Sequence, residues 1–94
     1  MAAKNSLAAA LRMVRKARGL SQESFSNVSS RTYLSALERD LKSPTLGKLG
    51  ELCEVLDIHP LVLVALAYAD ANPRKAGQLL TQVRQELDSL ALSG

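Results

Sequence analysis

Apolar residues recur along most of this chain at intervals of three and four positions, the spacing typical of amphipathic α-helices. No segment alternates between apolar and polar positions in the way that a half-buried β-strand does. The pattern therefore predicts an all-α fold. Start and stop signals divide the chain into six helical segments, at about residues 6–18, 21 to between 26 and 29, 30–39, 46–56, 60–66 and 73–92.

The most informative segment is residues 21–39, with the sequence SQESFSNVSSRTYLSALER. It predicts two short helices joined by a tight turn, because Ser21 can cap the first and Ser30 the second. Leu34 and Leu37 share one face of the second helix. The other faces carry mainly hydrogen-bonding or basic residues: Arg31, Thr32, Ser35, Ala36 and Arg39. Many proteins present such a helix to the major groove of DNA, so we interpret the chain as a DNA-binding protein.

Charge is unevenly distributed along the 94 residues, which carry a formal net charge of +3. Residues 1–42 contain eight lysines and arginines against three acidic residues, a net charge of +5. Residues 43–94 contain four against six, a net charge of −2. A basic first half suits contact with phosphate, and an acidic second half suits a different partner. An ordinary solvated surface remains the alternative when charge alone is considered.

Residue types needed for catalysis or metal binding are sparse. Cys53 is the single cysteine and lies in an apolar helical pattern, so we expect a buried small hydrophobe rather than a disulfide or a zinc ligand. His59, the single histidine, precedes Pro60 and is expected to cap a helix or pack in a turn. The chain shows no catalytic triad, paired carboxylates or glycine-rich phosphate loop. We therefore expect no enzymatic activity, no metal and no cofactor.

Length and hydropathy limit the class of protein further. The chain is long enough for one small domain with a single core. Its N-terminus lacks the long apolar run of a signal peptide, and its longest apolar run, residues 61–67, is far shorter than the ~18 residues of a membrane span. We therefore expect a cytoplasmic protein.

Residues 7–61 resemble the helix-turn-helix domain of Xre-type (phage Cro/repressor-like) transcriptional regulators. Three motifs in the family's order carry the resemblance: LRMVRKARGLSQESF, SSRTYLSALERDLKSPTLGKL and LCEVLDIHPL. The resemblance implies a lambda-repressor-like five-helix DNA-binding domain in residues 1–71 and a bacterial or phage origin. Residues 72–94 then form an additional C-terminal helix of the same domain.

The resemblance also implies roles for individual residues outside the recognition helix. Arg15 matches an arginine of the first helix that pairs with the glutamate matched by Glu38. Such a pair is structural, and it fixes how the first and third helices meet. Gln22 matches a glutamine that grips a DNA phosphate together with the helix N-terminus. The alternative for Gln22 is an ordinary polar residue in a first helical turn.

The third predicted helix matches the recognition helix of the family. The positions that face the major groove are matched by Ser30, Arg31, Thr32 and Ala36. Arg31 is the foremost candidate for reading sequence, because an arginine can donate two hydrogen bonds to guanine. The expected phosphate ligands at the edge of the groove are Tyr33, Ser35, Arg39 and Lys42. For Tyr33, packing against the second helix is an equal alternative.

The chain departs from the family pattern in one segment. Between Gln22 and Leu34 it is two residues shorter than usual, and the turn glycine is missing. The second helix must then be clipped, or its turn tightened, between Ser26 and Ser29. This change leaves the insertion angle of the third helix open. Asp57 stands where the family often has glycine, and aspartate tolerates the left-handed conformation.

The last predicted helix carries a heptad-like seam. Its members recur at spacings of four, three, four and three, and they are Ala76, Leu80, Val83, Leu87 and Leu90. This helix can pack onto its own domain, or it can form a homodimer together with the fifth helix, whose residues 61–66 offer excess apolar surface. The candidate dimer-interface residues are Leu63, Leu66, Leu79, Leu80, Val83, Leu87 and Leu90.

Together these features predict a sequence-specific DNA-binding transcriptional regulator, a repressor that binds a palindromic operator as a homodimer. Two-fold symmetry would place the half-sites about one DNA turn, ~34 Å, apart. One alternative is an antitoxin-type regulator that also binds a partner protein through the C-terminal helices. Another is a protein-interaction module in which the shortened turn has abolished DNA docking.

Overall fold

The computed structural model describes residues 6–93 and contains helices and loops, with no strand in that range. In chain order the elements are α1 (Leu7–Ala17), η1 (Gln22–Phe25), α2 (Arg31–Glu38), α3 (Leu46–Leu56), α4 (Pro60–Tyr68) and α5 (Pro73–Ser93). The all-α prediction is confirmed. The second predicted helix is a single 3₁₀ turn, η1, which matches the clipped helix, one of the two alternatives that the shortened sequence left open. Residues 1–5, the beginning of the predicted DNA-binding domain, and residue 94 lie outside the described residues.

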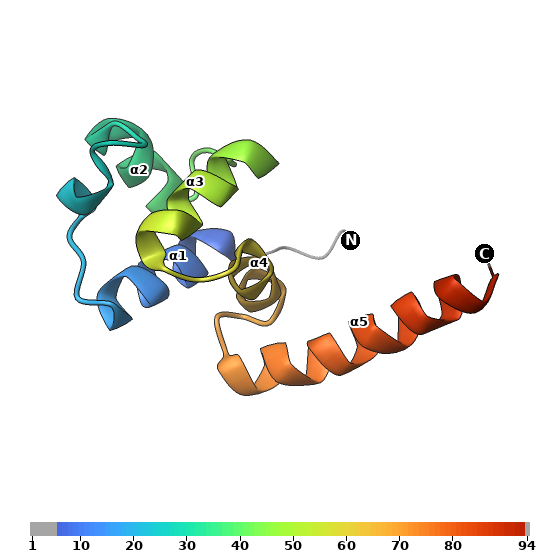
Figure 1. The fold of residues 1–94 in the computed structure, drawn as a ribbon. Helices are drawn as coiled ribbons and strands as arrows, with labels where there is room; N and C mark the ends of the chain where they lie inside the picture. Colours follow the sequence, from blue (N-terminus) through green and yellow to red (C-terminus); the bar gives the residue numbers. More distant parts are fainter. Residues whose placement is uncertain (1–5, 94) are drawn as a thin grey trace.

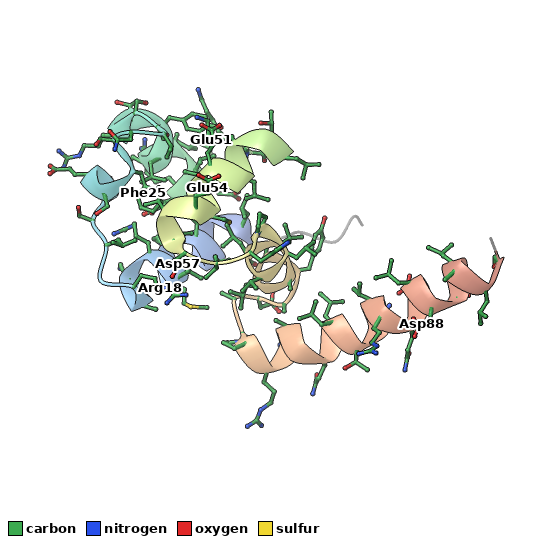
Figure 2. The ribbon with its side chains drawn as sticks, viewed as in Figure 1. Arg18, Phe25, Glu51, Glu54, Asp57 and Asp88 are labelled. Atoms are coloured by element: carbon green, nitrogen blue, oxygen red, sulfur yellow. The ribbon has the colours of Figure 1, made fainter. Side chains whose placement is uncertain are left out.

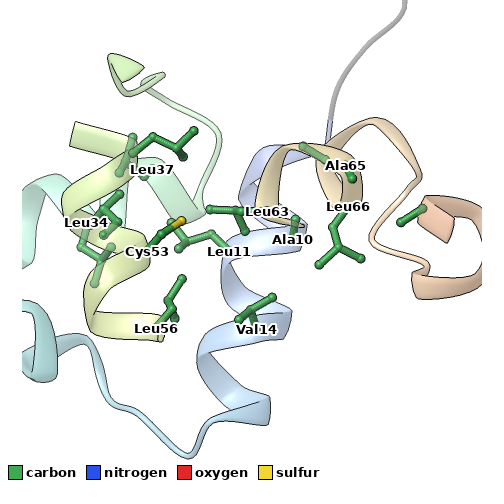
Figure 3. Packing of buried hydrophobic residues seen from close by; sticks show 14 of the residues in the cluster. Ala10, Leu11, Val14, Leu34, Leu37, Cys53, Leu56, Leu63, Ala65 and Leu66 are labelled. Carbon is green, nitrogen blue, oxygen red and sulfur yellow. The ribbon is translucent and has the colours of Figure 1, made fainter. Parts of the chain in front are cut away.

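One hydrophobic core lies among the first four α-helices and η1 (Figure 3). α1 packs against α2 and α4, while α3 packs against α4 and η1. The largest fully buried side chains include Leu11, Phe25, Leu34, Leu52, Leu56 and Leu63. Burying each of these side chains stabilises the fold by about 1.5–3 kcal/mol. Because α2 commits one face to this core, its opposite face is left to solvent.

Side chains cap the N-termini of four α-helices. Ser30 and Thr45 accept hydrogen bonds at 3.0 and 3.1 Å from the backbone N–H three residues ahead. Asn72 accepts one at 2.9 Å from the N–H two residues ahead. His59 accepts a hydrogen bond through Nδ1 at 3.0 Å at the start of α4, so the prediction that this histidine caps a helix is confirmed.

Left-handed backbone residues end three of the helices. Asp40, Asp57 and Asp70 have φ values of 60°, 58° and 53° at or just after the ends of α2, α3 and α4. The prediction that Asp57 takes this conformation in place of glycine is confirmed. Its carbonyl oxygen accepts a hydrogen bond from Arg18 Nη2 at 3.1 Å, which ties the end of α1 to the end of α3 (Figure 2). Ala71, with φ of 56°, takes the same conformation at a cost of about 1–2 kcal/mol.

α4 is apolar nearly all round, and the core takes up only one of its sides. Leu63 and Leu66, with 0% and 5% exposure, lie in the core (Figure 3). The prediction that these two leucines form a dimer interface is therefore wrong, because their own chain already encloses them. Leu61 and Val62 are the large apolar residues that this helix exposes near its start.

α5 leaves the body of the molecule after its first turns. Figure 1 shows its C-terminal half extending away from the other helices. Its 21 residues give a length of about 31 Å. The first half of α5 lies against α4, and Ala76 is buried there. The large apolar residues of the seam stay exposed along the rest of the helix: Leu80, Val83, Leu87 and Leu90.

Candidate DNA-binding surface

Glu38, at the end of α2, joins the elements that frame the candidate DNA-binding surface. Arg15 of α1 pairs with it through two bonds, with Nε 2.6 Å from Oε2 and Nη2 2.9 Å from Oε1. Arg15 Nη1 also donates to the carbonyl oxygen of Leu20 at 3.0 Å. The side chains of Arg15 and Glu38 are only 13% and 4% exposed. The ion pair that the family resemblance implies is therefore present, and its two-pronged geometry fixes α2 against α1.

Two further residues donate hydrogen bonds to Glu38. Gln22 Nε2 of η1 lies 3.2 Å from Oε1, and Arg12 Nη1 lies 3.2 Å from the backbone oxygen. Burial alone raises the pKa of Glu38, but the hydrogen bonds from Arg15 and Gln22 and the nearby positive charges outweigh burial. The net pKa of Glu38 is therefore below its ordinary value. The hydrogen bond to Glu38 raises the pKa of Arg15, so both groups are charged at neutral pH.

The shortened turn between η1 and α2 is closed by hydrogen bonds. The N–H groups of Val28 and Ser29 both donate to the Phe25 carbonyl oxygen at 2.9 Å. From α3, Lys48 Nζ donates to the Val28 carbonyl oxygen at 2.5 Å. Sequence reasoning missed Lys48. The available signal was a lysine in the first turn of a helix, where the helix dipole disfavours positive charge and an independent role is therefore expected.

The solvent face of α2 carries most of the predicted DNA contacts. Arg31, Thr32 and Arg39 are exposed, and Ser35 is half-buried. Ser30 precedes them, with its hydroxyl oxygen engaged in capping the helix. The structure corrects the prediction for Ala36, which is only 7% exposed and has almost no surface to offer a base.

An open groove of about 380 Å³ runs between η1 and α2. It is lined by Gln22, Arg31, Thr32, Ser35 and Arg39. Every one of these side chains carries a hydrogen-bond donor, and two carry guanidinium groups. Such a surface suits the negatively charged oxygens of a phosphate backbone. The structure thus brings together five of the residues predicted to bind DNA.

Three further contacts involve charged or aromatic residues on or next to α2. The Lys42 ammonium lies 5.6 Å from the centre of the Tyr33 ring, within cation–π range. Tyr33 is half-buried and packs against the hydrophobic core. Arg31 forms an exposed ion pair with Glu23 at 3.5 Å. Such an exposed pair contributes at most about 1 kcal/mol, so Arg31 can exchange Glu23 for another anion at little cost.

Comparison with known proteins agrees with this geometry. A family model described as Helix-turn-helix matches residues 11–63, more than half of the chain. The chain belongs to the Xre-type helix-turn-helix family. No curated protein and no solved structure matches the chain.

Membership assigns roles to the elements of this helix-turn-helix protein. The matched residues begin within α1 and end within α4, so they include η1, the shortened turn and α2 but not α5. They identify a DNA-binding transcription regulator with a lambda-repressor-like fold. η1 and α2 are the two arms of the motif, and α2 is its recognition helix.

Three more findings concern residues 6–93. No helix there is both long and apolar enough to cross a membrane. The same residues bring together no group of three or more His, Cys, Asp or Glu side chains able to hold a metal ion. Cys53 is buried as predicted, and burial raises the pKa of its thiol to about 11.

Proposed function

We propose that this helix-turn-helix protein is a sequence-specific repressor that binds a palindromic operator as a homodimer. The observation that carries the proposal is the solvent face of α2, where Arg31, Thr32 and Arg39 are exposed. Glu38 fixes this helix to α1 and η1 through its bonds with Arg15 and Gln22. A rigid support favours base readout, because the reading side chains must be held close to their productive geometry.

The residues that we propose to read the DNA sequence lie at the start of α2. Arg31 can donate two parallel hydrogen bonds to a guanine, which discriminates against a wrong base by about 1–3 kcal/mol. Thr32, on the next position of the same exposed turn, can place its methyl group against the methyl group of thymine. The exposed ion pair with Glu23 holds Arg31 near the groove in the absence of DNA.

The remaining polar residues position α2 on the phosphate backbone. Ser35 and Arg39 line the groove further along the helix, and Lys42 follows it in the chain. Gln22 uses one N–H of its amide on Glu38, so its second N–H is available to a phosphate oxygen. These contacts carry no sequence information, but they set the register of the recognition helix.

Dimerisation supplies the sequence specificity that a single recognition helix lacks. A single α2 reads only a few base pairs, whereas a two-fold dimer reads two half-sites about 34 Å apart and doubles the phosphate contacts. The exposed residues of the α5 seam support this part of the proposal: Leu80, Val83, Leu87 and Leu90, with the half-buried Leu79 beside them. A dimer bound to a promoter excludes polymerase without any additional domain, which is why we propose repression. We place this activity in the cytoplasm.

Selection of bound sequences from a random duplex library, at near-physiological salt, tests the proposal. An enriched palindrome is expected, and recovery of no motif by folded protein would contradict it. In the same assay Arg31→Ala should lose about 10- to 100-fold of the site preference, because the guanine contact is gone. Lys16→Ala removes one positive charge from an exposed position of α1 and should keep the preference. Equal behaviour of the two variants would remove Arg31 from base readout.

A second candidate is a module that binds a partner protein, as an antitoxin-type regulator does. The exposed apolar face of α5, with Glu86 and Asp88 nearby, favours it. This candidate predicts that binding to DNA is weak and unselective at physiological salt. Sequence-selective binding by the purified protein alone would contradict it.

A further inference from the structure

Two apolar surfaces on the C-terminal part of the chain remain uncovered. The first is a groove of about 430 Å³ between α4 and α5. It is lined by Leu61, Val64, Ala65, Tyr68, Leu79, Leu80 and Val83. The second is the free C-terminal half of α5, where Leu87 and Leu90 are 60% and 67% exposed. In Figure 1 this half extends away from α4, so one copy of the chain cannot cover its own groove with it.

The seam of α5 is nearly symmetric about Val83. Relative to that residue, the seam positions lie at −7, −3, +4 and +7, which are Ala76, Leu80, Leu87 and Leu90. If two such helices run antiparallel with Val83 at the centre, Leu80 of one copy faces Leu87 of the other. In the same register Leu90 of one copy lies level with Ala76 of the other, which is itself buried against α4, so Leu90 reaches the groove beside that alanine.

Charge along α5 also distinguishes the two possible orientations. The first turn carries Arg74 and Lys75, Arg84 lies next to the centre, and Glu86 and Asp88 follow in the second half. A parallel pair would bring like charges together, while an antiparallel pair brings the acidic half of one helix toward the basic start of the other. The helix dipoles oppose each other in the antiparallel pair as well, which adds to the preference.

We propose that two copies of the chain pair through antiparallel α5 helices, with Leu87 and Leu90 of each copy seated in the groove between α4 and α5 of the other. This inference rests on the homodimer of the proposed function and names its contact. One two-fold interface then covers both apolar surfaces of both copies. A parallel pair would instead leave the two grooves open.

This arrangement also sets the distance between the points where the two DNA-binding bodies join their α5 helices. With Val83 at the two-fold axis, the N-terminal ends of the paired α5 helices lie about 31 Å apart along the helix direction. α5 therefore acts as a spacer between the two helix-turn-helix units as well as their contact.

Disulfide trapping of single-cysteine variants tests the orientation. Cys53 is replaced by alanine throughout, although its burial and raised pKa already make it unreactive. Val83→Cys is expected to form a covalent dimer on mild oxidation, because both copies meet at the axis. Leu90→Cys is not expected to form a covalent dimer, because the two sulfur atoms would be about 20 Å apart, far beyond the reach of a disulfide. Leu80→Cys and Leu87→Cys should cross-link when mixed, and neither should cross-link alone.

Each other pattern overturns the proposal. Self-cross-linking of all four positions would show a parallel pair, and no cross-linking at all would show that α5 does not pair. The outcome is independent of DNA binding: a selected palindrome without these cross-links would leave the proposed function standing and reject this interface. Cross-links without a selected palindrome would support this interface and contradict the proposed function.

A matched pair of substitutions tests the contact without oxidation. Leu87→Lys should weaken the dimer by on the order of 100-fold or more in sedimentation equilibrium, because two buried leucines are lost per dimer. Leu92→Lys makes the same change at a leucine that is 90% exposed and lies about 200° around the helix from Leu90. It should leave the dimer within about threefold of the original. Equal effects of the two variants on dimerisation would reject the seam of α5 as the dimer contact.

Discussion

Replacing Glu38 by glutamine removes the charge on which the DNA-binding surface is assembled, while keeping the size of the side chain. In the folded protein the carboxylate accepts hydrogen bonds from Arg15 at 2.6 and 2.9 Å and from Gln22 at 3.2 Å. Glutamine offers one acceptor oxygen and an NH₂ group that faces donors. Arg15, only 13% exposed, is then left without its counter-charge.

The expected cost follows from this geometry. Removing one partner of a buried ion pair destabilises proteins by about 3–5 kcal/mol. Arg15 keeps its bond to the carbonyl oxygen of Leu20 and some solvent contact, so we expect about 2–4 kcal/mol for Glu38→Gln at pH 7. For a domain of this size the melting temperature should fall by at least about 10 °C.

The pH dependence gives the same variant a second, internal test. Because the pKa of Glu38 is lowered in the folded state, its carboxylate stabilises the fold above the unfolded-state pKa of about 4.3. That contribution is lost as the pH falls through the lower folded-state pKa, where the protonated acid resembles glutamine. The difference in unfolding free energy between the original protein and Glu38→Gln should therefore shrink as the pH is lowered toward 3.

Chemical denaturation from pH 7 to pH 3, at one fixed protein concentration, is the appropriate assay because dimerisation would make stability depend on concentration. The control is Glu51→Gln on the exposed side of α3, where the nearest cation, Lys48 Nζ, is 3.8 Å away (Figure 2). It should change stability by less than about 0.5 kcal/mol. If Glu38→Gln lowers the free energy of unfolding equally at pH 3 and pH 7, the electrostatic reasoning is refuted.

Three further predictions concern the turn, the end of α4 and the groove. Lys48→Met should cost about 1 kcal/mol in denaturant unfolding, because a charged donor to the Val28 carbonyl oxygen is lost from a partly exposed site. It should also weaken binding to the selected operator more than binding to random duplex; an equal loss on both would mean that the turn does not set the angle of α2. Ala71→Gly should raise the free energy of unfolding by about 0.5–1 kcal/mol, since glycine removes the strain of a φ of 56°. Gly77→Asn is the comparison variant, because this glycine of α5 has no positive φ and has open space around it. A loss of stability in Ala71→Gly would contradict the inference that Ala71 is strained. Glu23→Gln should tighten binding to operator and random duplex alike by removing a carboxylate 3.5 Å from Arg31, and band-shift titrations that show weaker binding would assign Glu23 a direct positioning role.

Local sequence signals predicted much of this fold. The period of apolar residues located the helices, Ser30 and Thr45 occupy the capping positions that their residue types favour, and His59 caps α4. These features depend on neighbours within a few positions of the chain. The left-handed conformation at Asp57 was predicted for the same reason, because it reflects a preference of the residue itself.

Partners distant in sequence were predicted only where a family resemblance supplied them. Arg15 and Glu38 are 23 residues apart, and the family pattern, not periodicity, paired them. The bond from Lys48 to the Val28 carbonyl oxygen had no such precedent and was missed. Ala36 was assigned to the groove from its match to the family, and its near-complete burial removes it from the surface that α2 presents to solvent.

By itself the sequence determined that the chain is helical, where most helices begin and end, and that two short segments form a helix-turn-helix motif. It could not determine which side of an element turns inward when apolar residues surround that element. α4 is such a case, because only packing against α1 decides that Leu63 is buried and Leu61 exposed. The tertiary structure also decided that the second half of α5 is left uncovered. Burial is a property of all the elements that meet at a place, so it is settled only when the whole chain has packed.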